Sequence, residues 1–203
     1  MMKVFYDTLH TAPTTSSTAR MVLECRAHHF LRDGRTLSLF PILCSYQPQG
    51  RAHSKYVYDK YTNNILRRQR LRLPKLKELL VDHETLHTHE LDVYYRPRSA
   101  NFATVDSWIL IRPSSKRPPI VLAFHMALNA TERNGKQIDL GWLGGLVPRD
   151  ARRYHIILTP EGVEPQINVP TDYLTAEFLG GRDVNEAFRV FHCRIDAVKL
   201  FKP

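Results

Sequence analysis

The stretch VDSWILIRPSSKRPPIVLAFHMAL (105–128) decides the fold, because it contains two apolar runs separated by turn residues. The first run (105–113) predicts a strand, and the second (120–128), which is apolar nearly throughout, predicts a strand in the centre of a sheet. The Pro- and Ser-rich residues between the runs favour a tight connection, so we expect a hairpin. RRYHIILTP (152–160) predicts a third strand that ends at a proline.

The sequence on both sides of this region predicts helices as well as strands. MVLECRAHHFLRDG and the residues before it favour a helix over 18–33, and SLFPILCSY (38–46) favours a strand. Further helices are expected over 132–147 and 171–181, and a strand followed by a short helix over 187–201. The stretch ILRRQRLRLPKLKELL (65–80) fits both strand and helix patterns. The mixture of elements predicts an α/β fold with a central mixed sheet flanked by helices.

Length and charge limit the organisation of the chain and its partners. The 203 residues suit one globular domain, so we expect a loose, Ser/Thr-rich segment over 1–19 and a single domain over 20–203. The net charge of +9 and a pI near 9.6 favour association with polyanions, although a basic protein need not bind one.

Cysteine usage and the N-terminal sequence indicate an intracellular protein. Cys25, Cys44 and Cys193 form no CxxC pair, and their odd number argues against a disulfide framework. The first 20 residues lack the apolar core of a signal peptide, and no apolar run approaches the length of a transmembrane helix. We therefore expect no membrane partner.

Three segments, YYRPRSANFATVDSWILI (94–111), IVLAFHMALN (120–129) and RRYHIILTPEGVEPQINVPTDYL (152–174), suggest a family. Together they resemble the restriction-endonuclease-like (PD-(D/E)XK) module of fungal Crinkler-type and retrotransposon-hot-spot proteins. The resemblance covers roughly 20–200. It implies a restriction-endonuclease-like fold, a metal-dependent nuclease site and, because Crinkler-type proteins are effectors thought to reach nuclei, a nuclear location.

The resemblance also implies roles for individual residues. Asp106 matches the metal-binding aspartate of the family, and Glu24 matches its helix glutamate. His125 stands where the family usually carries Gln or Glu, and Ala127 stands where it carries Lys, Thr or Ser. Hard divalent ions such as Mg²⁺ or Mn²⁺ prefer oxygen ligands, activate water and neutralise phosphate charge, whereas an imidazole suits softer metals. The two departures therefore predict a weakened or degenerate site.

Each of these residues also has a structural interpretation. Asp106 could cap a turn or bond Ser107, Glu24 could lie on a solvated helix face, and His125 could be a hydrogen-bonded core histidine. Lys136 or Arg133 could supply the charge that Ala127 lacks, if the catalytic lysine has migrated to a neighbouring element.

His83-Glu84-Thr85-Leu86-His87 spells a competing motif, HExxH. On a helix its two histidines would share one face and could bind zinc, with Glu84 as the general base. The segment 75–91 has no Gly or Pro and could be helical. A zinc peptidase also needs a third ligand, for which the candidates are Glu90, His89 and Asp106. The alternative interpretation is a cluster of surface residues.

The densest positive stretch predicts a nucleic-acid contact. Its side chains could track a phosphate backbone, and nearby tyrosines could stack on bases. The basic candidates are Arg67, Arg68, Arg70, Arg72 and Lys75, and the aromatic candidates are Tyr56, Tyr58 and Tyr61. Such runs are also common on solvated faces that bind nothing.

Three functional hypotheses follow from the sequence. The first is a metal-dependent phosphodiesterase, or a degenerate descendant that binds nucleic acid without cutting it. The second is a non-catalytic, effector-like module that contacts a host or regulatory protein. The third is a zinc peptidase that uses His83 and His87.

Overall fold

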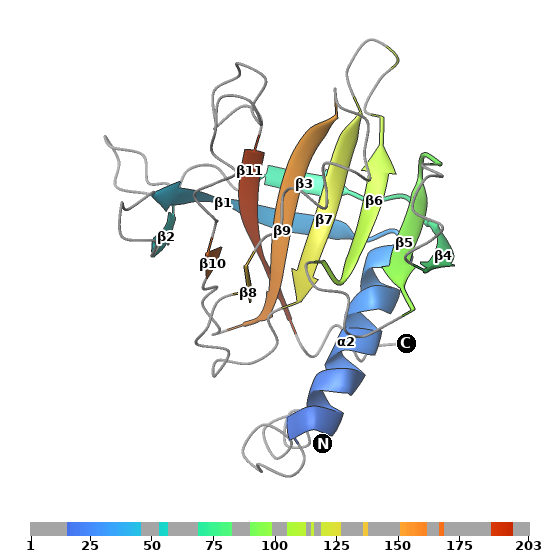
Figure 1. Ribbon diagram of the computed structural model, residues 1–203, viewed down its shortest axis with the longest axis horizontal. Coiled ribbons are helices and arrows are strands. Elements are labelled where there is room, and N and C mark those ends of the chain that lie inside the picture. The colour runs from blue at the N-terminus through green and yellow to red at the C-terminus, as the bar shows by residue number, and fades with distance from the viewer. Residues whose placement is uncertain are drawn as a thin grey trace.

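The computed structural model shows a curled β-sheet with one long helix on one side (Figure 1). Within the described residues, none of the helices is long and apolar enough to cross a membrane. The structure describes residues 16–45, 53–56, 69–82, 90–98, 105–112, 115, 119–126, 136–137, 151–161, 167–168 and 188–196.

The described strands form one large sheet and one small one. The large sheet has nine strands in the order β2-β1-β11-β9-β7-β6-β5-β4, with β3 paired to β1 beside this path. In the small sheet β10 pairs with β8. The bounds are helix α2 (Ser16–Arg32) and strands β1 (Thr36–Ser45), β2 (His53–Tyr56), β3 (Gln69–Arg72), β4 (Lys77–Val81), β5 (Val93–Pro97), β6 (Ser107–Ile111), β7 (Ile120–Met126), β8 (Lys136–Gln137), β9 (Arg152–Pro160), β10 (Ile167–Asn168) and β11 (Phe188–Ile195).

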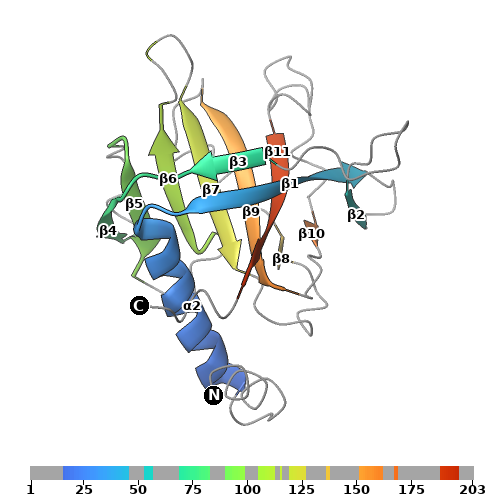
Figure 2. The same ribbon diagram turned by 180° about the vertical axis from the view of Figure 1, so that it is seen from behind.

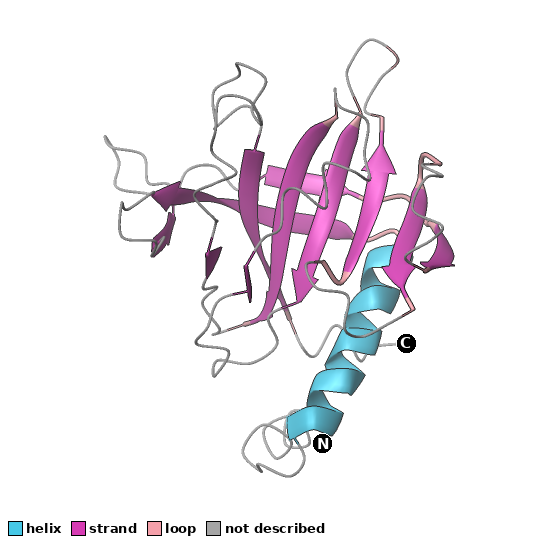
Figure 3. Ribbon diagram, in the orientation of Figure 1, coloured by secondary structure: helices cyan, strands magenta, loops and turns pink. Residues whose placement is uncertain are grey.

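The expected restriction-endonuclease-like α/β fold, a central sheet flanked by helices, is wrong. Strands dominate the described part of the chain, which contains a single helix, α2 (Figure 3). Strand β8 lies inside the segment 132–147, for which we expected a helix, and the expected helix over 171–181 lies outside the described residues. The physical reason is that the sheet curls, so that β1 and β3 cover the face that flanking helices would otherwise cover (Figure 2).

The predicted hairpin is confirmed, because β6 and β7 pair antiparallel with Ser107 opposite Phe124. Strand β9 then pairs parallel with β7, and β11 pairs parallel with β9. Side chains alternate between the two faces of a strand. Leu122 and Phe124 of β7 therefore lie in the core beneath α2, whereas Val121 and Ala123 belong to a second cluster on the other face of the sheet.

Helix α2 packs on the sheet through a stripe of apolar residues. Leu23, Ala27 and Leu31 are four residues apart, so they share one face of the helix, and all three are buried in the same core as Phe124 and Phe191. The predicted helix over 18–33 is thus confirmed, with bounds shifted by one or two residues. The contacts fix α2 to strands that come much later in the chain.

The Arg- and Leu-rich stretch resolves into two strands rather than a helix. Strand β3 pairs antiparallel with the first half of β1, with Thr36 opposite Arg72 and Ser38 opposite Arg70. Leu71 of β3 packs against the core, and the next residue but one, Leu73, is buried in it. Beyond Leu76 the chain enters β4, the last strand on the path at that side of the sheet.

A second apolar cluster lies on the opposite face of the sheet, over β4 to β7. Tyr95 and Trp108 stack there with their ring centroids 5.5 Å apart. Strand β4 contributes Val81 to this cluster, but its Leu79 and Leu80 are exposed. The core is therefore built on both faces of the central strands, which explains why 120–126 is apolar nearly throughout.

Cys193 of β11 provides a test of this packing through pH. Burial raises the pKa of the thiol from 9.0 to about 11, partly opposed by a backbone hydrogen bond with Ser38. Between these values only the unfolded chain loses the proton, so stability should fall as pH rises, by about 1.4 kcal/mol per pH unit. Urea unfolding from pH 8 to 11 should show this fall in the native protein and a shallower one in Cys193→Ala. Parallel pH profiles would contradict the prediction.

Candidate nucleic-acid interface

Asp106 connects the start of β6 to the end of β7. Its Oδ2 accepts a hydrogen bond from the backbone N–H of Met126 at 2.6 Å, and its own N–H donates to the carbonyl of Phe124 at 2.9 Å. One carboxylate oxygen is therefore engaged by the backbone of the neighbouring strand. This bond joins two neighbouring strands rather than capping a turn.

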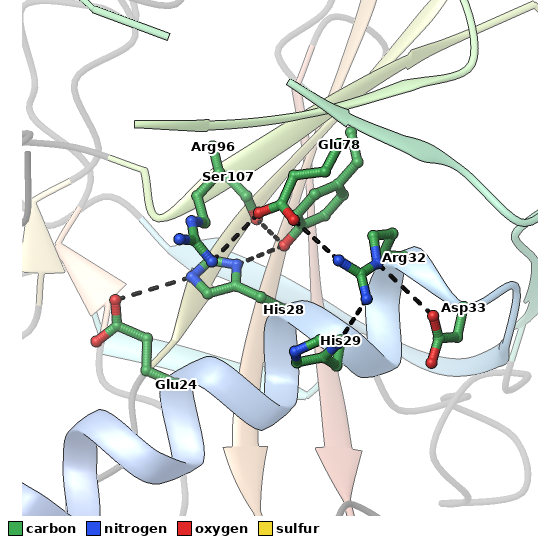
Figure 4. A network of polar contacts seen from close by, with 9 residues as sticks. Glu24, His28, His29, Arg32, Asp33, Glu78, Arg96 and Ser107 are labelled. Carbon is green, nitrogen blue, oxygen red and sulfur yellow. Dashed lines mark hydrogen bonds and ion pairs between the residues drawn. The ribbon is translucent and has the colours of Figure 1, made fainter. Parts of the chain in front are cut away.

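Glu24 begins a polar chain that links α2 to the sheet (Figure 4). Its carboxylate lies 3.8 Å from Nε2 of His28, whose Nδ1 lies 2.6 Å from the hydroxyl oxygen of Tyr94. The hydroxyl of Tyr94 donates in turn to Oγ of Ser107 at 2.7 Å. Burial raises the pKa of Tyr94 well above its ordinary value, so the hydroxyl stays protonated. Because His28, Tyr94 and Ser107 are all buried, this series of polar contacts anchors α2 to the sheet.

His125 lies on the other side of the sheet from α2. It alternates with Phe124 and Met126, which face the helix, and it is 2% exposed. Its Nε2 is 3.1 Å from Nδ1 of His155, and the two rings stack with their centroids 5.4 Å apart. The sheet therefore separates the imidazole of His125 from the carboxylate of Glu24.

The three residues matched to the nuclease family are not brought together. In the ranges that the structure describes, no group of three or more His, Cys, Asp or Glu residues could hold a metal ion. His83 and His87 of the HExxH motif lie outside those ranges. The strand β4 occupies 77–81, so the segment 75–91 is not one continuous helix. Ala127, Arg133, His89, Tyr58 and Tyr61 also lie outside the described residues, as do the side chains of Lys136 and Tyr56.

Some arginines of the domain are neutralised by carboxylates (Figure 4). Glu78 of β4 lies between two of them, with Oε2 3.0 Å from Nη1 of Arg32 and Oε1 3.2 Å from Nη1 of Arg96. Arg98 pairs with Asp82 at 3.3 Å, where both side chains are exposed. The positive charge of these side chains is therefore balanced by carboxylates of the same protein.

The arginines of β3 are arranged differently. Arg70 and Arg72 are both exposed and alternate with Leu71, which points into the core. Directly opposed residues of an antiparallel pair share a face, so Ser38 and Thr36 of β1 lie on the same outer face as these arginines. No ion pair joins either arginine to a carboxylate in the described part of the chain. Their charge is therefore directed to solvent.

An aromatic ring and a third arginine extend this face. Phe40 follows Thr36 and Ser38 at intervals of two, so it lies on the outer side of β1 and is half-buried. The guanidinium of Arg194, an exposed residue of β11, lies over the Phe40 ring at 5.8 Å from its centroid. We call the surface formed by Arg70, Arg72, Thr36, Ser38, Phe40 and Arg194 the basic face.

The sequence predicted only part of the basic face. Arg70 and Arg72 were among the five basic candidates; Lys75 is also exposed but lies beyond β3, where its backbone bridges to Asp33. Arg67 and Arg68 lie outside the described residues. Phe40 and Arg194 were missed, because they meet only through the pairing of β1 with β11, and no local pattern signals that contact.

Comparisons with protein-family models, with curated proteins and with solved structures each found no match. The resemblance to Crinkler-type proteins therefore remains a prediction from the residues quoted above.

Proposed function

We propose that this domain binds nucleic acid through the basic face and does not cleave it. The observation that carries the proposal is the pair of exposed arginines on β3, Arg70 and Arg72, which are free of carboxylate partners in the described ranges while other arginines of the domain are paired. Arginine presents a planar set of donors that suits phosphate.

The net charge supports the same conclusion. The excess of nine positive charges gives the whole chain a long-range attraction for polyanions, and the basic face offers a place where it can be used at short range. Hydroxyl groups often contribute phosphate contacts, and Thr36 is exposed beside Arg72.

Binding without cleavage is supported by the placement of the family-matched residues. A metal-dependent nuclease needs its carboxylates and a charged or polar partner around one ion. Here His125 and Glu24 lie on opposite sides of the sheet, and Asp106 Oδ2 is engaged by the N–H of Met126.

The proposal predicts a specific loss in the variant Arg70→Gln/Arg72→Gln. Each phosphate contact adds about 0.7 (single strand) to 0.9 (duplex) to the magnitude of the slope of log affinity against log salt, so this magnitude should fall by roughly 1.4–1.8. Affinity for a labelled 20-nucleotide probe should fall roughly tenfold or more at low salt. Fluorescence anisotropy over a series of KCl concentrations measures both quantities.

The matched control is Lys77→Gln/Arg112→Gln, which removes the same charge from exposed positions on β4 and after β6. It should lower affinity much less. Equal losses in the two variants would mean that only net charge attracts the probe, and would overturn the assignment to the basic face. Magnesium- or manganese-dependent nicking of a plasmid that is lost in Asp106→Ala would overturn the claim that the domain does not cut.

A further inference from the structure

We infer that the ligand of the basic face is a single-stranded nucleic acid, with a base stacked on Phe40 and phosphates held by Arg70 and Arg72. This inference rests on the proposed function and specifies the class of ligand. It follows from three features of the surface, which are its aromatic ring, its spacing of charges and its shape.

The ring of Phe40 lies on the face of β1 that points away from the core beneath α2. Leu37 and Leu39 point into the core and are almost fully buried, whereas Phe40 is half-buried on the opposite face of β1, two residues after Ser38 and opposite His192 of β11. An aromatic side chain on an exposed sheet face is a platform on which an unpaired base can stack. The guanidinium of Arg194 lies over this ring, 5.8 Å from its centroid, so a base that stacks on Phe40 must displace it to the side of the stack.

The charges are arranged in a line rather than around a pocket. Residues two apart on one strand are separated by about 7 Å, so Arg70 and Arg72 present two guanidinium groups along the direction of β3. Strand β3 runs antiparallel to β1, which carries Phe40. A ligand that extends across these strands can therefore accept hydrogen bonds from Arg70 and Arg72 of β3 on its phosphates and stack a base on the ring that β1 provides.

The shape of the surface argues against duplex DNA. A two-stranded ribbon can enter a major groove only if it protrudes from the protein. The β1–β3 ribbon instead lies flat on the domain, because its inner side chains, such as Leu39 and Leu71, pack against the core (Figure 2). Paired bases also keep their faces inside the duplex stack, so they cannot reach the ring of Phe40. A single strand presents both phosphates and base faces at once.

The test compares Phe40→Leu with Phe40→Trp, using a 20-nucleotide thymidine strand, an abasic strand of equal length and a duplex of equal length. Loss of one stacked base should weaken binding of the thymidine strand by about five- to a hundredfold in Phe40→Leu. Phe40→Trp should bind as tightly as the native domain or more tightly. Affinity for the abasic strand should be the same in all three proteins, because it has no bases to stack.

The matched control is Phe30→Leu, which makes the same substitution at a partly buried position on α2, away from the basic face. Thermal unfolding checks that each variant is folded. Native binding to duplex as tight as to the single strand, with no effect of Phe40→Leu, would overturn this inference and leave the proposed function intact. Binding to acidic vesicles or heparin as tight as to any oligonucleotide, or no binding at all, would overturn both.

Discussion

Replacing Tyr94 by alanine is expected to lower the free energy of unfolding by about 4–8 kcal/mol. Removal of a fully buried aromatic ring alone costs about 3–5 kcal/mol, because the surrounding residues do not close the cavity. The same change leaves His28 and Ser107 buried without the hydroxyl that joins them, which costs about 1–3 kcal/mol more. Since domains are typically stable by only about 5–15 kcal/mol, the variant should be close to unfolding at room temperature.

Urea unfolding followed by circular dichroism measures this loss, and Tyr94→Phe divides it into two parts. The phenylalanine variant keeps the ring and removes only the hydroxyl, so it should lose about 1–3 kcal/mol. If Tyr94→Phe were as stable as the native protein, the series of polar contacts that runs from Glu24 through His28 and Tyr94 to Ser107 would not hold α2 to the sheet. Tyr154→Ala provides a control at a partly buried tyrosine of β9.

Gly34→Ala is expected to cost about 3–4 kcal/mol, although it adds a single methyl group. Gly34 has a φ of +78°, a conformation that costs other residues about 1–2 kcal/mol. A Cβ atom there would also lie 2.9 Å from the backbone nitrogen of Lys75 and 3.1 Å from the carbonyl carbon of Pro74. Hydrogen bonds from Leu73 N to Arg35 O and from Leu76 N to Arg32 O hold this backbone in place, so it cannot retreat freely.

The expected loss corresponds to a fall in Tm of roughly 6–16 °C for a chain of this size. Gly34→Asn separates the two causes, because asparagine tolerates positive φ better than alanine but carries the same Cβ. An asparagine variant as unstable as the alanine variant would assign the cost to the close approach of Lys75. Arg35→Ala, at the next and exposed position, should change Tm little. A Gly34→Ala protein with native Tm would contradict the prediction.

Elements whose pattern is local could be predicted from the sequence. The apolar runs at 105–113 and 120–128 became β6 and β7, and the turn residues between them correctly indicated antiparallel pairing. The strands at 38–46, 152–160 and within 187–201 are also present as β1, β9 and β11. Each of these segments contains enough apolar residues to identify it without knowledge of its neighbours.

The fold class could not be predicted, because it depends on which strands pair. Whether a sheet is flat and flanked by helices or curled over itself is decided here by β1, which pairs with β3 over one half and with β2 and β11 over the other. Leu71 also fits a helix when read alone, and only its pairing with Leu37 of β1 makes it part of a strand.

The surroundings of the candidate site residues could not be predicted for a related reason. Asp106 and His125 have side chains that could bind a metal, but residue type does not reveal which face of a strand a side chain occupies or what it already contacts. The backbone N–H of Met126 and the ring of His155 meet them in the folded structure. The arginines of β3 were among the candidates because the density of positive charge is visible in the sequence itself.

The pairing of β1 with β11 has a kinetic consequence. These strands lie about 150 residues apart in the chain, and the helix before β1 shares one core cluster with side chains of β11. A ribosome must therefore synthesise β11 before β1 can pair with this strand, and the core beneath α2 is incomplete until then. Folding should accordingly be slow, as it is for proteins with high contact order, and the nascent N-terminal half should depend on chaperones to avoid aggregation.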